Sequence, residues 1–302
     1  MVPLKTSAVR SCDRSAQPGS GRHYEAMPEL PEVETIRATL AETIVDRRIV
    51  GVELFRPGYV KKGKTPKDLL LGGRVDRLDR RGKQLAIVVD DGRALCVHLG
   101  MSGQLLLTTQ ETVASLTHVH VLWRLKSDCG FGDQRLVMRD PRRFGGVWTY
   151  PSITALRRDR WTKLGVDALT ITSDELGAAL SRTSRAIKAA LLDQSVLAGL
   201  GNIYCDESLF RAGIKPQSPA NRVSVTRTRR LAAAIHTTLD LALKARGSTL
   251  RDYRDSNGDT GSYFSHRLVY GRAGEPCPQC ERPLKNRVIA GRTSVWCTRC
   301  QR

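Results

Sequence analysis

The sequence predicts an α+β protein with several domains: a β-rich N-terminal part that opens on a helix, a helical part, and a short metal-binding tail. Three observations predict this order. Short apolar runs broken by Gly and Asp-Gly turns fill residues 48–150, helical spacing dominates from 153 to about 250, and two Cys-x2-Cys pairs lie near the C-terminus. A chain of 302 residues is long enough for two or three domains, each with its own core.

The first predicted helix covers residues 28–41, where Val33, Ile36 and Leu40 recur at helical spacing and Pro31 is tolerated in a first turn. The strand signals that follow are RIVGVELF, RVDRLDRRGKQLAIVVD, ALCVHLGMSGQLLL, HVHVLWRL and RLVMRD. A β-sandwich or a barrel fits their spacing. The helical signals further on are SDELGAALSR, SRAIKAALLDQ, NIYCDESLFRAG and SVTRTRRLAAAIHTTLDLALKARG.

The chain is strongly basic, with 49 Lys+Arg against 30 Asp+Glu, a formal net charge of +19 and a pI near 10.1. This excess favours a polyanionic partner, usually nucleic acid, although a merely basic soluble protein remains the alternative on charge alone. No apolar run approaches the roughly 18 residues of a membrane span. Residues 1–26 lack the apolar stretch of a signal peptide, and we interpret them as a leader that is disordered or lies upstream of the true start.

The strongest single motif is the cysteine pattern CPQC at 277–280 and CTRC at 297–300. Four thiolates at this spacing complete a closed tetrahedral zinc shell, whereas four unrelated reduced cysteines are the alternative. An ion with no open position stabilises a fold and does no chemistry. The segment VIAGRTSVW predicts the hairpin of a zinc ribbon, with Arg292 beside Gly291 at its tip. The predicted ligands are Cys277, Cys280, Cys297 and Cys300.

The segment MPELPEVETI begins at residue 27. A chain that starts Met-Pro loses its methionine, and the proline nitrogen then becomes a secondary amine. Terminal amines serve as nucleophiles because their pKa, roughly 8, lies below that of lysine. A secondary amine that condenses with an aldehydic carbon gives a cationic iminium. Pro28 is therefore expected to react only when no residue precedes it, since an upstream residue turns its nitrogen into an amide.

Together with RRGKQL, HLGMSGQL, DPRRFGG, GLGNIYCDESLFRAGI, STLRDY and VYGRAGEPCPQC, this start resembles the bacterial formamidopyrimidine-DNA glycosylases from Met27 to Arg302. The resemblance implies base excision repair: removal of oxidised purines (8-oxoguanine, formamidopyrimidines) and β,δ-elimination at the abasic site. It implies a catalytic β-sandwich over 28–152, a helix–two-turn–helix domain over 153–262 and a zinc finger over 263–302. It further implies one structural Zn²⁺, damaged double-stranded DNA as the partner, and a monomer at the nucleoid of a bacterial cytoplasm.

The resemblance gives four residues catalytic roles. Pro28 is the Schiff-base nucleophile on the anomeric carbon, and Glu29 donates a proton to the sugar as its ring opens. Lys83 matches the lysine credited with proton transfer in β-elimination, and Arg292 the finger arginine linked to δ-elimination. Without the family, Glu29 and Glu32 are first-turn acids stabilised by the helix dipole, and Lys83 is a solvated strand residue.

A glycosylase extrudes its target nucleotide and fills the gap left in the base stack. Met101 in HLGMSG, and Arg142 with Phe144 in DPRRFGG, match the family residues that fill this gap. Read without the family, these side chains are core residues.

Phosphate contacts are expected at the GLGN segment, where Gly199 and Gly201 permit close backbone approach and Asn202 caps the following helix. An ordinary helix–helix turn is the alternative. His118 aligns with a DNA-contacting histidine of the family, and His120 is expected on the same strand face, although both could be surface residues.

A phosphate-contacting lysine of the family is replaced near SRTSRAIK, with Arg182, Arg185 and Lys188 as stand-ins. The loop RDSNGDTGS, which would cap the flipped base, leaves the base preference open at that edge.

Two other functions remain. One is an endonuclease VIII-type enzyme for oxidised pyrimidines, against which PELPEVE, Met101 and Phe144 argue. The other is a non-catalytic zinc-dependent DNA-binding protein, if the leader is retained.

Overall fold

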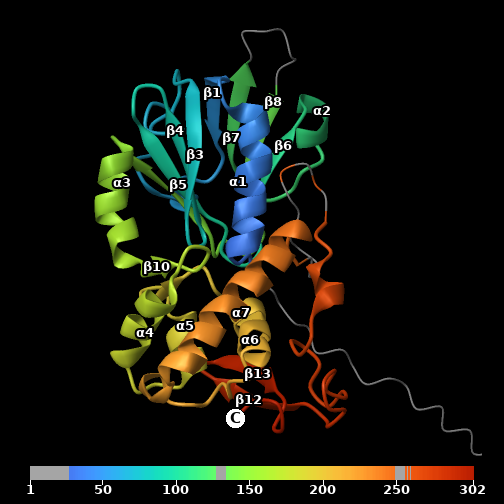
Figure 1. The fold of residues 1–302 in the computed structure, drawn as a ribbon. Helices are drawn as coiled ribbons and strands as arrows, with labels where there is room; N and C mark the ends of the chain where they lie inside the picture. Colours follow the sequence, from blue (N-terminus) through green and yellow to red (C-terminus); the bar gives the residue numbers. More distant parts are fainter. Residues whose placement is uncertain (1–26, 127–133, 249–255, 257, 259) are drawn as a thin grey trace, which may run out of the picture.

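The computed structural model describes residues 27–126, 134–248, 256, 258 and 260–302. A β-sandwich lies above a helical region, and a small C-terminal hairpin packs below the helices (Figure 1). The leader, residues 249–253 of STLRDY, and residues 254, 255, 257 and 259 of RDSNGDTGS fall outside the described residues. Within the described part of the chain, no helix is both long and apolar enough to cross a membrane.

The N-terminal strands form a sandwich of two sheets and not a barrel. The first sheet has the order β1 (Arg48–Leu54), β7 (Val119–Lys126), β8 (Gln134–Arg139), β6 (Gln104–Thr108). The second has the order β2 (Val60–Lys62), β9 (Gly146–Tyr150), β5 (Ala94–His98), β4 (Gln84–Val89), β3 (Val75–Arg81). All neighbours are antiparallel except β2 and β9. Apolar side chains of both sheets form one core between them, so the predicted sandwich is confirmed.

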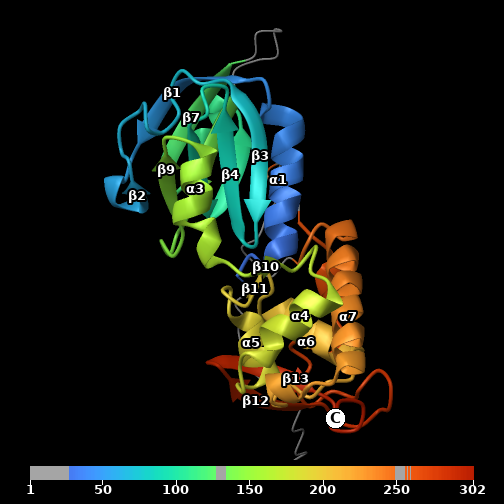
Figure 2. The same cartoon turned by 60° about the vertical axis from the view of Figure 1, so that its left-hand side comes forward.

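Two elements next to the predicted boundary differ from the expectation. The segment GVWTY was not predicted as a strand, yet it forms β9 inside the second sheet. Helix α3 (Ile153–Asp159), capped by the Ser152 hydroxyl, packs on the outer face of this sheet through Leu156 and not on the helical region. Figure 2 shows α3 beside β4, above the helices. The spacing of apolar residues predicts a helix, but it does not predict whether that helix packs on the sandwich or on the helical region.

The helical region consists of α4 (Ser173–Ser181), α5 (Ile187–Leu192), α6 (Asn202–Arg211) and α7 (Val225–Lys244), with a short parallel pair β10 (Val166–Asp167) and β11 (Leu197–Ala198). A capping box between Thr172 and Glu175 starts α4. The apolar face of α7 is buried through Leu231, Ile235 and Leu239 against α4 and α6. The shorter elements of the chain are α2 (Gln110–Val113), η1 (Pro57–Tyr59), η2 (Trp161–Lys163), η3 (Ala220–Arg222) and η4 (Tyr263–His266).

Helix α1 (Leu30–Ile44) joins the two bodies. Its first residue, Leu30, is fully buried in the core of the helical region. Val33, Ile36 and Leu40 are buried in the core of the sandwich. The apolar stripe of one helix therefore contributes to two cores, and the residues before it are fixed at the junction.

A buried ion-pair network holds the same junction. Arg80 on β3 donates to the carboxylate of Asp167 on β10 at 2.8 and 3.2 Å and to that of Glu34 on α1 at 2.7 Å. Asp167 also accepts from the backbone N–H of Gly82 at 2.7 Å. Because the arginine fork is satisfied on both sides, the β3–β4 turn is fixed against the helical region.

The C-terminal hairpin has the predicted zinc-ribbon form. Strands β12 (Lys285–Ile289) and β13 (Arg292–Trp296) are joined by Ala290 and Gly291, both with positive φ (49° and 71°), as a tight two-residue hairpin turn requires. The sulfur atoms of the four predicted ligands all lie within 4.8 Å of one another. Four thiolates about 2.3 Å from a common centre give sulfur separations of this size, so the cluster fits one structural Zn²⁺.

Lys188 is not a DNA contact, contrary to the expectation from the sequence. Its side chain is fully buried, and its Nζ donates to Asp206 Oδ1 at 2.6 Å and to the Thr293 carbonyl at 3.1 Å. The other oxygen of Asp206 accepts from the Val295 N–H at 3.0 Å. Burial raises the pKa of Asp206 to about 6, against the lowering effect of Lys188. The lysine joins α5, α6 and the ribbon and cannot reach a phosphate.

Lys188→Ala should therefore destabilise the fold without changing the salt dependence of DNA binding. Removing one partner of a buried ion pair costs about 3–5 kcal/mol in the free energy of unfolding. Urea unfolding followed by tryptophan fluorescence measures this loss. The matched control is Lys244→Ala, which removes an exposed pair with Asp240 and should cost about 0.5 kcal/mol or less. Equal losses in the two variants would contradict a structural role for Lys188.

Candidate active site

A cavity of about 440 Å³, called here the catalytic cavity, lies where α1, the β3–β4 turn, the start of α6 and the ribbon tip meet. Six of the residues singled out in the sequence line it: Glu29, Lys83, Met101, Gly201, Asn202 and Arg292. Pro28 is buried next to Glu29, and Met27, the residue before it, lines the cavity. The fold thus brings together residues that are up to 265 positions apart in the chain, from Met27 to Arg292.

Glu29 binds the N-terminus of α6. Its carboxylate accepts hydrogen bonds from the backbone N–H groups of Gly201 at 2.6 Å, Ile203 at 2.9 Å and Tyr204 at 3.4 Å. These are donors that the first turn of a helix leaves unpaired, and the positive end of the helix dipole favours an anion there. The side chain is 2% exposed.

Both glycines of GLGN make room for residues at the start of α1. A Cβ on Gly201 would lie 2.4 Å from the Glu29 carboxyl carbon, and a Cβ on Gly199 (φ 117°) would lie 2.4 Å from Leu30. The expected cap is also different, because Gly201 is the N-cap of α6 and Asn202 is its first helical residue. The buried Asn202 Oδ1 has no hydrogen-bond partner among the described residues, and Asn202 lines the cavity.

Glu32 forms a second buried acid site one turn along α1. Its carboxylate accepts from the Tyr204 hydroxyl at 2.5 Å, the Ser248 N–H at 2.6 Å and the Ser248 hydroxyl at 2.9 Å. It also accepts from the N–H of Glu29 at 3.0 Å. Both acids at the start of α1 are therefore used to bind the helical region, beyond any effect on the dipole of their own helix.

Lys83 reaches the cavity from the β3–β4 turn. Gly82 before it has φ 55°, and a Cβ there would lie 3.0 Å from Ala198, so this turn needs a residue without a side chain. Lys83 is 7% exposed, which excludes the solvated strand position. Burial lowers the pKa of Lys83 from its ordinary value, while the charges of Glu29 and Glu32 oppose that shift.

The proton affinities of Glu29 and Lys83 are shifted toward each other. Burial raises the pKa of Glu29 to about 7, against the lowering effects of Lys83 and of the amides of α6. A carboxyl with this pKa carries a proton about half of the time near neutral pH, and a buried lysine gives up its proton more readily than a solvated one. Glu29 can therefore exchange a proton with a bound substrate near neutral pH, and burial makes Lys83 a better proton donor than a solvated lysine.

Two residues that were not expected from the sequence, His98 and Gln194, also line the catalytic cavity. Nδ1 of His98 accepts from the Gly100 N–H at 3.1 Å, which places the ring proton on Nε2. Burial lowers the pKa of His98 to about 4, so the ring is a neutral donor. Gln194 accepts from the Gly199 N–H and donates to the Leu200 carbonyl, and so shapes the GLGN loop. The only local feature of the sequence that points to His98 is the glycine-containing turn that follows it, HLGMSG.

Arg142 and Phe144 lie on one exposed loop, residues 140–145, called here the wedge loop. Phe144 is 61% exposed, which excludes the core position considered as the alternative. Met101 is half-buried on the neighbouring loop, and the two loops touch, because a Cβ on Gly100 would lie 2.4 Å from the Gly145 nitrogen.

Asp140, on the buried side of the wedge loop, fixes the loop in place. Its fully buried carboxylate accepts from the Ser102 hydroxyl at 2.6 Å, the Gly145 N–H at 2.8 Å and the Tyr59 hydroxyl at 3.1 Å. The Ser102 oxygen in turn accepts from the Arg142 N–H at 3.1 Å. An exposed phenylalanine on a loop held in this way is preorganised to contact another molecule.

The two histidines of HVHVL do not share a face. His118 precedes β7 with φ 61° and is exposed, whereas His120 is buried, stacks on Tyr59 and hydrogen bonds to the Asp140 carbonyl at 2.8 Å. A register shift between Val119 and Val121 breaks the alternation on which the expectation rested.

Arg185 remains exposed between α4 and α5 and forms an ion pair with Asp193 at 3.0 Å. Asp193 lines the catalytic cavity. Arg185 is thus available at the surface near the cavity.

Comparisons with known proteins agree with this geometry. Family models match the formamidopyrimidine-DNA glycosylase N-terminal domain at residues 27–147, its H2TH (helix–two-turn–helix) domain at 164–254, and the zinc finger found in FPG and IleRS at 274–302. The formamidopyrimidine-DNA glycosylase of Desulfitobacterium hafniense is 38% identical over 279 residues, which cover 91% of this chain and all of that protein.

Two solved structures have the same fold. A crystal structure of a Lactococcus lactis FPG mutant with Fapy-dG containing DNA is 32% identical, with a TM-score of 0.82, and covers 91% of this chain and 99% of that one. A structure of MutM with carbocyclic 8-oxo-G containing DNA is 32% identical, with a TM-score of 0.81 and the same coverage. The chain belongs to the formamidopyrimidine-DNA glycosylase family.

Proposed function

We propose that this protein is a bifunctional DNA glycosylase and abasic-site lyase that excises oxidised purines from double-stranded DNA. The observation that carries the proposal is the catalytic cavity, where Glu29, Lys83 and Arg292 surround the position next to Pro28. The relatives bound to Fapy-dG and 8-oxo-G DNA support oxidised purines as the substrate class, in preference to oxidised pyrimidines. The net charge of +19 supports a DNA partner. The protein acts as a monomer at the bacterial nucleoid.

In the proposed reaction, the free amine of Pro28 attacks the anomeric carbon of the damaged nucleotide, and the glycosidic bond breaks. Glu29, which carries a proton about half of the time near neutral pH, gives this proton to the sugar oxygen as the ring opens and the iminium forms. Lys83 carries the proton in the β-elimination, and Arg292, exposed at the ribbon tip, acts in the δ-elimination. Arg142, Phe144 and Met101 occupy the vacated stack.

The reactive form of the chain begins at Pro28. Both the resemblance and the N-terminal family match begin at residue 27, which supports this start. In the chain as described, Met27 occupies a position in the cavity wall, so its removal would open the Pro28 nitrogen to the cavity. Zinc bound by the four cysteines would hold the ribbon and, with it, Arg292 in place.

Protein that begins at Pro28 should form a covalent adduct with oxidised-guanine DNA in the presence of borohydride, because a secondary amine must form an iminium. Mass spectrometry of the trapped peptide should place the adduct on Pro28. Protein that keeps residues 1–27 should give no adduct, since its Pro28 nitrogen is an amide. Efficient trapping of this longer form would show that another amine is the nucleophile.

Lys83→Ala should retain its affinity for a duplex with a stable abasic analogue while single-turnover cleavage falls by about 10²- to 10⁴-fold. The reason is that Lys83 is buried and acts on protons, whereas a phosphate contact would be exposed. Arg142→Ala should show the reverse, with affinity lost first. A salt slope flatter by about one in Lys83→Ala would instead identify Lys83 as a phosphate contact.

A further inference from the structure

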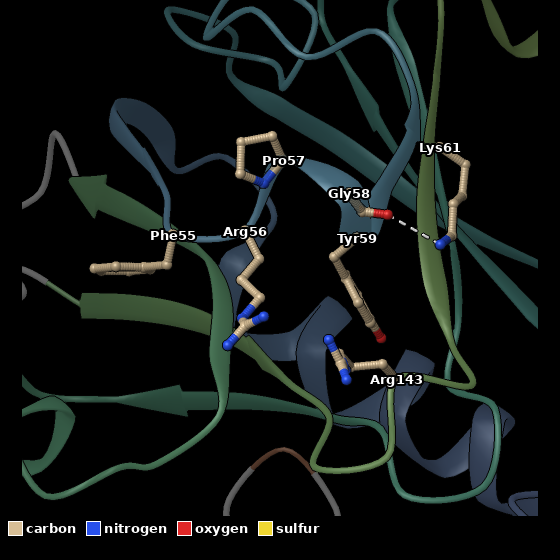
Figure 3. Close-up of a pocket in the computed structure, with 7 residues that line it drawn as sticks. All are labelled: Phe55, Arg56, Pro57, Gly58, Tyr59, Lys61 and Arg143. Carbon is tan, nitrogen blue, oxygen red and sulfur yellow. Dashed lines mark hydrogen bonds between the residues drawn. The ribbon is translucent and has the colours of Figure 1, made fainter.

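A second cavity, of about 580 Å³, lies on the β-sandwich beside the wedge loop. We call it the basic cavity; its lining residues are Phe55, Arg56, Pro57, Gly58, Tyr59, Lys61 and Arg143 (Figure 3). Figure 3 shows Arg56, Tyr59 and Arg143 converging on one space, while Lys61 lies beyond Gly58, whose carbonyl accepts its hydrogen bond at 3.0 Å. None of the mechanistic residues above lies in this cavity.

The charge of the basic cavity is not neutralised. No acid is among its lining residues, and within the described part of the chain no carboxylate lies within ion-pair distance of Arg56, Lys61 or Arg143. A cavity of similar size around Lys62 differs in this respect. There Lys62 pairs with Asp159 at 3.5 Å and Arg93 with Asp91 at 2.6 Å. Unpaired guanidinium groups that share one space repel each other unless an anion joins them.

The basic cavity is rigidly connected to the wedge loop. The N–H groups of Phe55 and Arg56 both donate to the His120 carbonyl, at 3.0 and 3.3 Å. The Tyr59 ring stacks on His120 and its hydroxyl binds Asp140, the residue that fixes the wedge loop. The backbone that carries Arg56 is therefore anchored to the same residues as the wedge loop that carries Phe144.

Arg143 lines the basic cavity and has a left-handed backbone (φ 58°). A non-glycine residue in this conformation is strained, and such strain persists where the surroundings demand a side-chain direction. The wedge loop lies between the two cavities.

On the side of the catalytic cavity, Gly100 contacts Phe144 and Gly145. On the side of the basic cavity, a Cβ on Gly145 would lie 2.5 Å from the Tyr59 hydroxyl. The two cavities share no lining residue.

From this arrangement we infer that the basic cavity binds a backbone phosphate of the DNA strand opposite the lesion. This inference rests on the proposed function, since it takes the catalytic cavity to hold the damaged strand and the wedge loop to enter the stack. If the damaged strand lies in the catalytic cavity and the wedge loop enters the base stack, the DNA strand on the opposite side of the wedge loop is the complementary strand. Arg56 and Arg143 would hold one phosphate between them, with Lys61 at the rim, and would fix the depth to which Phe144 enters.

The test compares Arg56→Gln with Arg158→Gln by DNA affinity over a range of salt concentrations. Arg158 is an exposed arginine of the same domain, paired with Asp159 outside the basic cavity. Arg56→Gln should weaken binding and flatten the salt slope by about 0.9, the value for one lost phosphate contact, whereas Arg158→Gln should match the wild type. The slope is measured on undamaged duplex too, so that an enzyme without glycosylase activity would still reveal the site. Equal slopes in wild type and Arg56→Gln would overturn the inference.

Phosphate ethylation interference on a duplex with a stable abasic analogue identifies the strand. Wild-type binding should be blocked by ethylation at one phosphate of the complementary strand, and Arg56→Gln should be indifferent to that modification. Loss of an interference signal on the damaged strand would contradict the assignment. Arg143→Gln, tested in the same way, should lose the same signal as Arg56→Gln. Signals at different phosphates would show that the two arginines do not share one anion.

Discussion

The site depends on one contact, the Glu29 carboxylate bound by the amide groups at the start of α6. Helix N-termini accept anions readily, and here the anion comes from the protein itself. Because Glu29 precedes α1, the contact ties the sandwich to the helical region at the residue next to Pro28. The carboxyl is buried at this junction, and burial raises its pKa to about 7 although the amides of α6 and the charge of Lys83 lower it. The junction between the two bodies therefore determines both the position of Glu29 and its proton affinity.

Other buried charges fix the position of the neighbouring segments relative to this contact. Arg80 holds the Lys83 turn against Asp167, Lys188 holds the ribbon against Asp206, and Asp140 holds the wedge loop. In a chain with net charge +19, many cations remain on the surface for DNA, while all six buried acids of the described residues bind neighbouring segments. The protein thus separates charges that build the site from charges that contact its polyanionic partner.

Much of the fold and of the catalytic cavity could be predicted from the sequence, because short local motifs determine them. The cysteine spacing predicts the ribbon, the strand and helix periods predict the two bodies, and the family motifs predict the residues of the catalytic cavity. Contacts between distant segments could not be predicted. Nothing local in RAIK indicates that Lys188 is buried against Asp206, and nothing in GLGN indicates that its glycines make room for Glu29. His118 and His120 were misplaced because a register shift is invisible in the spacing.

The most direct test of this account is the pKa of Glu29, measured by carbon NMR on glutamate-labelled full chain, in which Pro28 is an uncharged amide. The Glu29 signal is the one missing from Glu29→Gln. The account predicts a midpoint near 7, with a further rise in Lys83→Met, because the charge of Lys83 lowers this pKa. A midpoint near the ordinary value of about 4.3, unaffected by Lys83→Met, would show a solvated carboxylate and contradict the account.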